Sequence, residues 1–407
     1  ENTLIGGLAG DALTTGADNV ALGSTALSGD TAGADSVAVG RRALQTQNFS
    51  TTTSTYNTAV GSNAGQAVTT GIHNTLLGGL AGDALTDADK NIAIGYNALT
   101  ADTLGSRSVA IGVGTLGTQN FTTATNAYNV GVGHNAGTSI TTGVNNTLLG
   151  GITGDALTTG SENVAVGRSA LGADTLGSHN VGVGFQALAS QNFTTATDVH
   201  NVAVGYNTGV SVTTGTDNTL VGALAGDALT DADFNVALGT TALSSDTLGS
   251  RSVALGYGTL GSQNFSTATN VYNVAVGHAA GNNISTGVRN SILGGLALQS
   301  DTLGSNNVAV GYAALNTQNF TTATDSYNVA VGSLAGLSVT TGQLNTLVGA
   351  LAGDALTVGL SNTAIGFQAL SSDIQGHRST AIGQGSLDSQ SFSSSTNSNN
   401  VGVGYQA

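Results

Sequence analysis

The sequence predicts an all-β fold in which the chain forms a parallel β-solenoid of about 23 coils. A five-residue motif, seen in Asn19-Val20-Ala21-Leu22-Gly23, occurs 23 times along the 407 residues. Successive copies follow one another at a short 17-residue interval, which a longer 21-residue interval interrupts regularly. Self-similarity at a short fixed period is typical of solenoids, in which each coil stacks only on its neighbours. Proline, which would break the ladders between stacked strands, is absent.

The repeats also predict the domain organisation. Three short intervals and one long interval make a larger unit, and the fifth unit lacks one short interval without losing phase. The 17-residue coil is therefore a structural unit in its own right, and we predict a single solenoid domain over residues 1–407. Its units span residues 2–73, 74–145, 146–217, 218–289, 290–344 and 345–407.

Composition limits the core and the partners. The chain has 61 Gly and only 4% aromatic residues, which predicts a narrow core of small and β-branched side chains. The net charge of −15, with few charged residues of either sign, argues against nucleic acid and anionic membrane surfaces as partners. Cysteine is absent, which excludes disulfides and thiolate metal sites. No transmembrane run is visible, so we expect no membrane insertion of this segment.

The first and fifth positions of the motif predict how each coil begins and turns. The first position is Asn in 19 copies and Ser in four, and a repeated amide can form a hydrogen-bonded ladder from coil to coil. The fifth position is Gly in every copy, as at Gly6 and Gly404. Such a Gly predicts a corner with positive φ or a close backbone approach. After it come two variable residues and a small one, such as Ala26 or Ala98, which we interpret as a second short strand followed by a polar turn.

Both faces of the first strand carry apolar or small residues. Positions two and four are mostly Val, Ile or Leu, and position three is Ala, Gly, Leu or, once, Ile292. Alternation places position three on the opposite face from positions two and four. One face can point into the core of its own coil, whereas the other would leave an apolar stripe. Because small residues allow close approach, we expect the position-three stripe to be covered by another copy of the chain.

Each 21-residue coil carries an insert with its own signature, as in Gln47-Asn48-Phe49, and we expect its four extra residues to bulge outward. A Thr/Ser run follows, then usually an aromatic residue before the next Asn. The rings could stack on sugars of a surface glycan, or the Phe could fold back and cover the bulge. The candidate recognition residues are Phe49, Tyr56, Phe121, Tyr128, Phe193, His200, Phe265, Tyr272, Phe320, Tyr327 and Phe392.

The motif resembles a known family of repeats. The stretches 201–206, 307–312 and 362–370 are similar to the head repeats of YadA-like trimeric autotransporter adhesins and to 17-residue repeats in bacteriophage tail fibres. The resemblance implies a left-handed β-roll, three identical chains around one axis, and an extracellular role in attachment on a virion or cell surface. A host-surface glycan or protein would then be the receptor. The regular 21-residue coil departs from the autotransporter pattern.

Aspartates recur in two phases of the repeat. Asp11, Asp83, Asp155, Asp227 and Asp354 share one phase, and Asp30, Asp102, Asp174, Asp246, Asp301 and Asp373 share the other. Calcium between coils is one interpretation, because hard cations take several oxygen ligands. We favour turn chemistry, in which Asp caps a corner through its own backbone. Members of one phase lie too far apart to share an ion. We therefore predict no metal and no cofactor.

No catalytic constellation stands out. The six His residues mostly fall at different phases and have neither ligand spacing nor a recurrent nucleophile beside them. Gly-x-Gly strings such as Gly131-Val132-Gly133 lack the strand-to-helix context of nucleotide sites. We therefore predict no catalytic residues and a structural, adhesive fibre shaft rather than an enzyme. Because the repeats show no caps, the alternative is an extracellular filament subunit polymerising end to end, or one segment of a longer protein.

Overall fold

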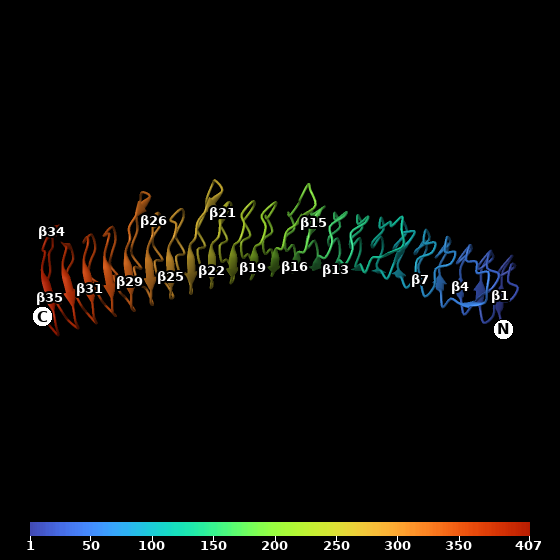
Figure 1. Ribbon diagram of the computed structural model, residues 1–407, viewed down its shortest axis with the longest axis horizontal. Coiled ribbons are helices and arrows are strands. Elements are labelled where there is room, and N and C mark those ends of the chain that lie inside the picture. Colours follow the sequence, from blue (N-terminus) through green and yellow to red (C-terminus); the bar gives the residue numbers. More distant parts are fainter. The chain divides into compact units, whose positions relative to one another are not determined.

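The predicted all-β class is confirmed. The computed structural model of the chain describes residues 1–407 and contains strands and turns but no helix. Each of two compact units, residues 1–201 and residues 202–407, is a β-solenoid in which successive coils stack their strands in parallel (Figure 1). No helix has the length and hydropathy needed to cross a bilayer. That residues 1–407 form one domain stays a prediction.

Unit 1 contains one three-residue strand per coil and pairs of two-residue strands, each formed between a long coil and the short coil before it. The three-residue strands are β1 (Thr3–Ile5), β2 (Val20–Leu22), β4 (Val37–Val39), β6 (Thr58–Val60), β7 (Thr75–Leu77), β8 (Ile92–Ile94), β10 (Val109–Ile111), β12 (Val130–Val132), β13 (Thr147–Leu149), β14 (Val164–Val166) and β16 (Val181–Val183). The two-residue strands are β3 (Gly33–Ala34), β5 (Thr53–Ser54), β9 (Gly105–Ser106), β11 (Thr125–Asn126), β15 (Gly177–Ser178) and β17 (Thr197–Asp198).

Unit 2 follows the same plan. Its three-residue strands are β18 (Val202–Val204), β19 (Thr219–Val221), β20 (Val236–Leu238), β22 (Val253–Leu255), β24 (Val274–Val276), β25 (Ser291–Leu293), β27 (Val308–Val310), β29 (Val329–Val331), β30 (Thr346–Val348), β31 (Thr363–Ile365), β33 (Thr380–Ile382) and β35 (Val401–Val403). Its two-residue strands are β21 (Gly249–Ser250), β23 (Thr269–Asn270), β26 (Gly304–Ser305), β28 (Thr324–Asp325), β32 (Gly376–His377) and β34 (Thr396–Asn397).

Every three-residue strand covers motif positions two to four, and equal positions stack. Val20 of β2 pairs with Val37 of β4, which pairs with Thr58 of β6 across a long coil. The extra four residues of a long coil therefore leave the register of the sheet unchanged. The long coils absorb them in a projecting loop, seen near β21 and β26 in Figure 1, which agrees with the predicted bulge.

The predicted amide ladder is present inside the solenoid. The N–H of Asn74 donates to Asn57 Oδ1 at 2.9 Å, and that of Asn91 donates to Asn74 Oδ1 at 3.0 Å. The side-chain amide of Asn74 also donates to the Ala88 carbonyl at 2.8 Å. All three Asn side chains are fully buried. Because each amide oxygen and amide nitrogen finds a partner, this polar column avoids the cost of burying unpaired groups.

The motif Gly forms both features that the sequence predicts, a left-handed corner and a close approach. Gly23 has φ of 139°, and a Cβ placed on it would lie 2.5 Å from the Gly40 carbonyl oxygen of the next coil. Real Cβ atoms do not come so close to a carbonyl, so any larger residue would push the coils apart. The spacing of roughly 4.8 Å between stacked strands leaves no room for that shift.

The predicted outward direction of position three is wrong. Ala21, Ala38 and Leu76 are fully buried in the core of their own coils, whereas Val20 and Leu22 are 36% and 43% exposed. The narrow interior also contains the buried Asn column, so the inward face accepts Ala most often. Positions two and four, with the larger Val, Ile and Leu, form the outward face. The face that needs a cover is thus the more apolar one.

The predicted second strand after the Gly corner is also wrong. Thr25 and Leu27 have φ of 55° and 53°, in the left-handed region, with Ala26 between them. Extended strands need negative φ at successive residues, so this segment forms turns instead. It still bonds to the next coil, because the Leu27 N–H donates to the Ala43 carbonyl at 3.0 Å. Complete burial of Leu27 offsets the cost of about 1–2 kcal/mol for its left-handed backbone.

Core volume is matched between neighbouring coils. Where position three is the large Leu76, the left-handed residues Gly65 and Gly82 contact its methyl groups. A Cβ on Gly82 would lie 2.8 Å from Leu76 Cδ2 and 2.8 Å from Leu85 Cδ1. In the next coil, which has Ala93 at position three, the buried Leu99 takes the Gly position. Gly beside Leu76 therefore leaves the space that this larger side chain fills, as close packing requires.

Candidate functional site

The rings of the Gln-Asn-Phe inserts point inward. Phe49 is 8% exposed and Phe320 is 4% exposed, and Phe392 is half-buried. The remaining insert rings, Phe121, Phe193 and Phe265, are buried as well. A buried ring offers no face to a ligand, so the structure favours the alternative in which Phe folds back and covers the bulge. The exposed part of the insert is the segment after the Phe, for example Thr122, Thr123 and Ala124.

Beneath each insert lies a buried carboxylate that is held by amides. Asp102 Oδ2 accepts from Gln119 Nε2 at 2.6 Å, and Asp102 Oδ1 accepts from the N–H groups of Gly105 at 3.0 Å and Phe121 at 3.1 Å. Gln119 Nε2 also donates to Ser108 Oγ at 3.0 Å, and its oxygen accepts from Asn129 at 2.9 Å. The turn chemistry expected for this phase of Asp is therefore confirmed. Burial raises the pKa of Asp102, although the amide donors oppose that shift.

The bond from Gln to the buried Asp recurs in every long coil. The side-chain amide of Gln47, Gln119, Gln191, Gln263, Gln318 or Gln390 donates to the Asp 17 residues earlier at 2.6 Å. Sequence reasoning treated the Gln as part of a recognition signature and missed this pairing. The signal was present, because the Gln always follows the Asp by one coil length. The network anchors the insert and gives the Gln-Asn-Phe signature a structural purpose.

The aromatic residues before the motif belong to an exposed column. We call the residue immediately before each motif Asn or Ser the leading column. Its members Tyr56, Tyr128, Tyr272 and Tyr327 are 48–58% exposed, and His200 is exposed too. Neighbours in the column touch one another: Tyr56 stacks on His73 with ring centroids 5.6 Å apart, and His200 stacks on His179 at 5.3 Å. The Arg107 guanidinium lies 5.5 Å from the centre of the Tyr128 ring.

A second exposed column was not singled out by sequence reasoning. We call the residue immediately after each motif Gly the trailing column. Its aromatic members include Tyr96, Tyr206, Tyr257, Tyr312 and Phe367, which are 45–59% exposed. Tyr257 stacks on His278 at 5.4 Å, and Arg168 lies 5.8 Å above the Phe185 ring. The sequence signal for this column was an aromatic residue that recurs directly after the motif Gly.

The outward positions of the strands lie between the two columns and form an apolar face. Leu77, Leu238 and Leu293 at position four are 45%, 46% and 52% exposed. Position-two residues such as Ile92 and Val274 are 36% and 44% exposed. We call this surface the strand face. A large exposed apolar stripe on a regular scaffold is typical of an interaction surface.

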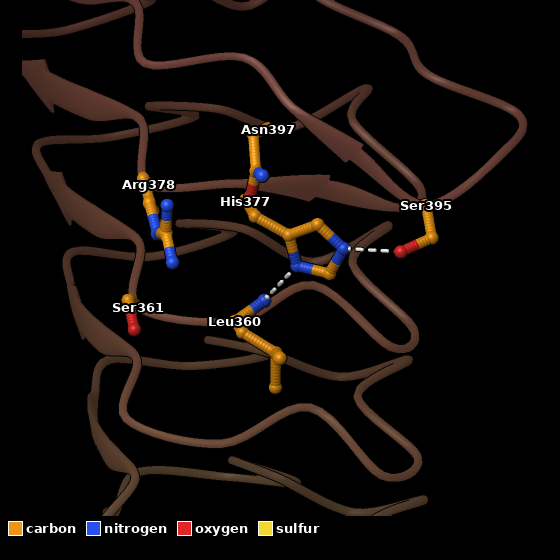
Figure 2. Close-up of a pocket in the computed structure, with 6 residues that line it drawn as sticks. All are labelled: Leu360, Ser361, His377, Arg378, Ser395 and Asn397. Atoms are coloured by element: carbon orange, nitrogen blue, oxygen red, sulfur yellow. Dashed lines mark hydrogen bonds between the residues drawn. The ribbon is translucent and has the colours of Figure 1, made fainter.

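An open cavity of about 300 Å³ lies beside the last long coil. It is lined by Leu360, Ser361, His377, Arg378, Ser395 and Asn397 (Figure 2). The Leu360 N–H donates to His377 Nδ1 at 2.8 Å, so Nδ1 carries no proton and Nε2 does. His377 Nε2 lies 2.6 Å from Ser395 Oγ and therefore donates to it. A general base must accept the serine proton, so this pair lacks the arrangement of a Ser-His nucleophile.

Equivalent coils explain why His377 lies there. In earlier units a Ser hydroxyl takes its place, as where Ser106 Oγ accepts from the Asp89 N–H at 2.9 Å and Ser250 Oγ accepts from the Asp233 N–H at 3.0 Å. His377 supplies the same acceptor to the same coil-to-coil contact. Sequence reasoning took this His for an ordinary surface residue, and only its phase in the repeat indicates the contact.

The Asp residues of the first phase do not gather into a cluster. Asp83 Oδ1 accepts from Thr100 Oγ1 at 2.5 Å. Partial burial raises the pKa of Asp155, Asp227 and Asp354. The structure contains no group of three His, Asp or Glu side chains that could hold a metal ion.

Comparison with known proteins adds no family to this description. No model of a protein family matches the chain, and no curated protein matches it either. The features on which a function can be proposed are therefore those of the structure itself. It is a repetitive β-solenoid with buried polar ladders, an exposed apolar strand face and two exposed columns beside that face.

Proposed function

We propose that the chain is a structural and adhesive fibre shaft, a homotrimeric tail fibre or cell-surface adhesin that is extracellular and mediates attachment. The observation that carries this proposal is the strand face, an apolar surface repeated on coil after coil. Water contact with so many Val, Leu and Ile side chains is unfavourable, and another copy of the chain has the matching periodicity to cover them. The number three comes from the resemblance of the repeats.

The role that we propose is not catalytic. A repetitive β-solenoid is typical of structural proteins. The Ser-His pair that lines the cavity, Ser395 and His377, has its proton on the wrong nitrogen for general-base catalysis. The polar groups of the interior are used in ladders and anchors rather than directed at a substrate.

Self-association through the strand face is tested by Leu22→Asp and Leu77→Asp, each placed on that face. Each variant should weaken self-association on the order of tenfold or more, because full burial of a Leu is worth about 1.5–3 kcal/mol. The matched control is Leu8→Asp, since Leu8 is 62% exposed but lies outside the face. Light scattering across a dilution series measures the effect. Equal masses for all three variants would contradict the proposal.

Attachment would use the loops that project from the long coils toward a host-surface glycan or protein. The exposed residues at their tips are 122–124, 194–196 and 266–268. Replacing these tips with Gly should reduce retention of the protein on host cells, whereas Thr15→Gly and Thr214→Gly, at exposed turns of short coils, should not. Unchanged retention of the loop variant would place attachment elsewhere.

A further inference from the structure

The leading and trailing columns carry complementary residues within the same coil. Two Arg residues occur in the trailing column, Arg41 and Arg168. Six positions before each of them, across the strand, the leading column holds an acid, Asp35 or Glu162. The other trailing positions hold no acid that would repel a neighbouring carboxylate and no further Lys or Arg.

Several aromatic and basic residues also pair within a coil, whereas Arg107, Arg289 and Arg378 share a coil with Val113, Gly295 and Gln384. The same-coil pairs of leading and trailing residues include Lys90 with Tyr96, Tyr128 with His134, His200 with Tyr206, Arg251 with Tyr257, and Tyr272 with His278. Ammonium and guanidinium groups bind favourably over Tyr rings, and the Tyr-His pairs can stack as they do within each column. Complementarity therefore extends over coils well separated along the chain.

The two acid–Arg pairs do not form within one chain. A nearly extended backbone six residues long separates the two columns by up to roughly 20 Å, with the strand between them. No ion pair joins Asp35 to Arg41 or Glu162 to Arg168. Glu162 instead lies 3.1 Å from His179 Nε2 in its own column, and Arg168 lies over Phe185 in its own column. Each coil thus presents a matching set of groups on opposite borders of the strand face.

We propose that neighbouring copies of the chain dock in register, with the leading column of one copy against the trailing column of the next. Asp35 of one copy then meets Arg41 of its neighbour, and Glu162 meets Arg168. This inference rests on the self-association proposed above and specifies its register. Because the two surfaces differ, the contact is heterologous, and it closes into a ring if the rotation between copies closes. The exposed rings of the leading column are thereby assigned to contacts between copies.

The charges distinguish this register from its neighbours. A shift by one coil places Asp35 opposite Ser24 or Ser62 and breaks both ion pairs. In one direction of shift a single new pair forms, between Asp18 and Arg41. The strand face alone would tolerate such slips, since its apolar residues repeat on every coil. The columns therefore supply the register that the apolar surface lacks.

Cysteine cross-linking tests the register directly, because the chain has no Cys of its own. The variant Asp35→Cys/Arg41→Cys should form a disulfide-linked oligomer on oxidation, resolved on a denaturing gel. The matched controls are Asp35→Cys/Ser24→Cys and Asp35→Cys/Ser62→Cys, which are shifted by one coil in either direction. Little cross-linking of the controls supports the proposal. Equal or stronger cross-linking of a control overturns it, as does failure of all three variants to cross-link while the protein still self-associates.

Charge exchange provides a second, independent readout. Asp35→Arg and Arg41→Asp alone should each weaken self-association about two- to fivefold per interface, the range expected for an exposed ion pair. The double variant Asp35→Arg/Arg41→Asp should restore it. Additive losses in the double variant overturn the proposed contact. If the unaltered protein is a monomer at every concentration, the proposed shaft fails first and the register has no interface to act on.

Discussion

At the scale of single residues, the buried Asp of each long coil has the most demanding surroundings. All of the groups that face Asp102 are donors: the side chain of Gln119 and the N–H groups of Gly105 and Phe121. A carboxylate, which only accepts, satisfies them completely. The insert is thus held by hydrogen bonds to this carboxylate as well as by burial of its Phe ring.

Replacing this carboxylate should lower the folding stability, and a second substitution opposite it should restore that stability. Asp102→Asn turns an NH₂ group toward the Gln119 amide nitrogen, so two donors oppose each other, and we expect a loss of about 1–3 kcal/mol. Adding Gln119→Glu restores an acceptor opposite the new donor and should recover most of the loss. Chemical denaturation of the single and double variants measures both values. Additive losses would contradict the network.

The pKa of the same residues predicts a pH dependence. Burial raises the pKa values of Asp102, Asp174 and Asp301 in the folded chain. A raised folded-state pKa means that the folded chain binds the proton more tightly. The stability that this tighter proton binding adds should therefore be complete below the unfolded pKa of about 3.9. It should be lost as pH rises through the folded-state pKa values. Titration of the Asp102 carboxyl carbon by NMR, assigned with Asp102→Asn, measures the shift. A midpoint below the unfolded value would show that the amide donors outweigh burial.

Individual residues were predictable where the repeat itself carries the information. The Asn ladder and the Gly corner follow from one residue type at one phase in every coil. The pairing of Gln119 with Asp102 was missed because the two residues lie one coil apart in sequence and contact only after the coils stack. The inward position of the Phe rings was left open, since a recurring aromatic serves packing and recognition equally well.

At the scale of the coil, substitutions at two Gly residues distinguish the effect of close packing from the effect of chain entropy. Gly82 lies in a crowded site and Gly151 in an open one. Gly82→Ala places a Cβ 2.8 Å from Leu76 and Leu85 at φ of 55°, and should destabilise the fold by about 1–3 kcal/mol. Gly151→Ala meets no atom within 4 Å, so it should be neutral or stabilise by about 0.4–1 kcal/mol. Thermal unfolding compares the two variants. Similar losses for both would contradict the volume matching of the core.

Loss of one whole coil should be tolerated where the join reproduces a natural unit. Deleting residues 82–98 joins Ala81 to Leu99 and creates a coil much like 290–300, where Leu298 follows Ala297 directly. The register is preserved and the joined coil has a natural counterpart with Ile292 and Leu298, so we expect a folded chain with little change in unfolding temperature. Deleting residues 82–89 shifts the phase by half a coil and should abolish cooperative unfolding. Circular dichroism during heating distinguishes the two deletions.

The path of the coil after the Gly corner was not predictable from residue types. Left-handed backbone is usually indicated by Gly or Asn, yet Thr25, Leu27 and Arg42 adopt it here. Hydrogen bonds to the next coil and burial of the alternate side chains favour this path over a strand. Those contacts exist only in the stacked state, so a single coil read by itself suggests an extended segment.

At the scale of the whole molecule, the repeat places most of its exposed apolar surface on one side of each coil, the strand face. The sequence showed that both faces of the strand are apolar, but the direction of each face depends on volume. The Asn column and the Gly corner leave room inside for Ala more readily than for Val, so Val20 and Leu22 face outward. In the register that we propose, the leading and trailing columns border that face, and a second copy of the chain covers it.

The mass of the purified chain in solution tests this account most directly. Light scattering at several dilutions should give a constant multiple of 39.7 kDa, and three times that mass for the proposed trimer. Mass that rises steadily with concentration would indicate end-to-end filaments instead. A monomer at every concentration would contradict the central claim, because the strand face would then remain in contact with water.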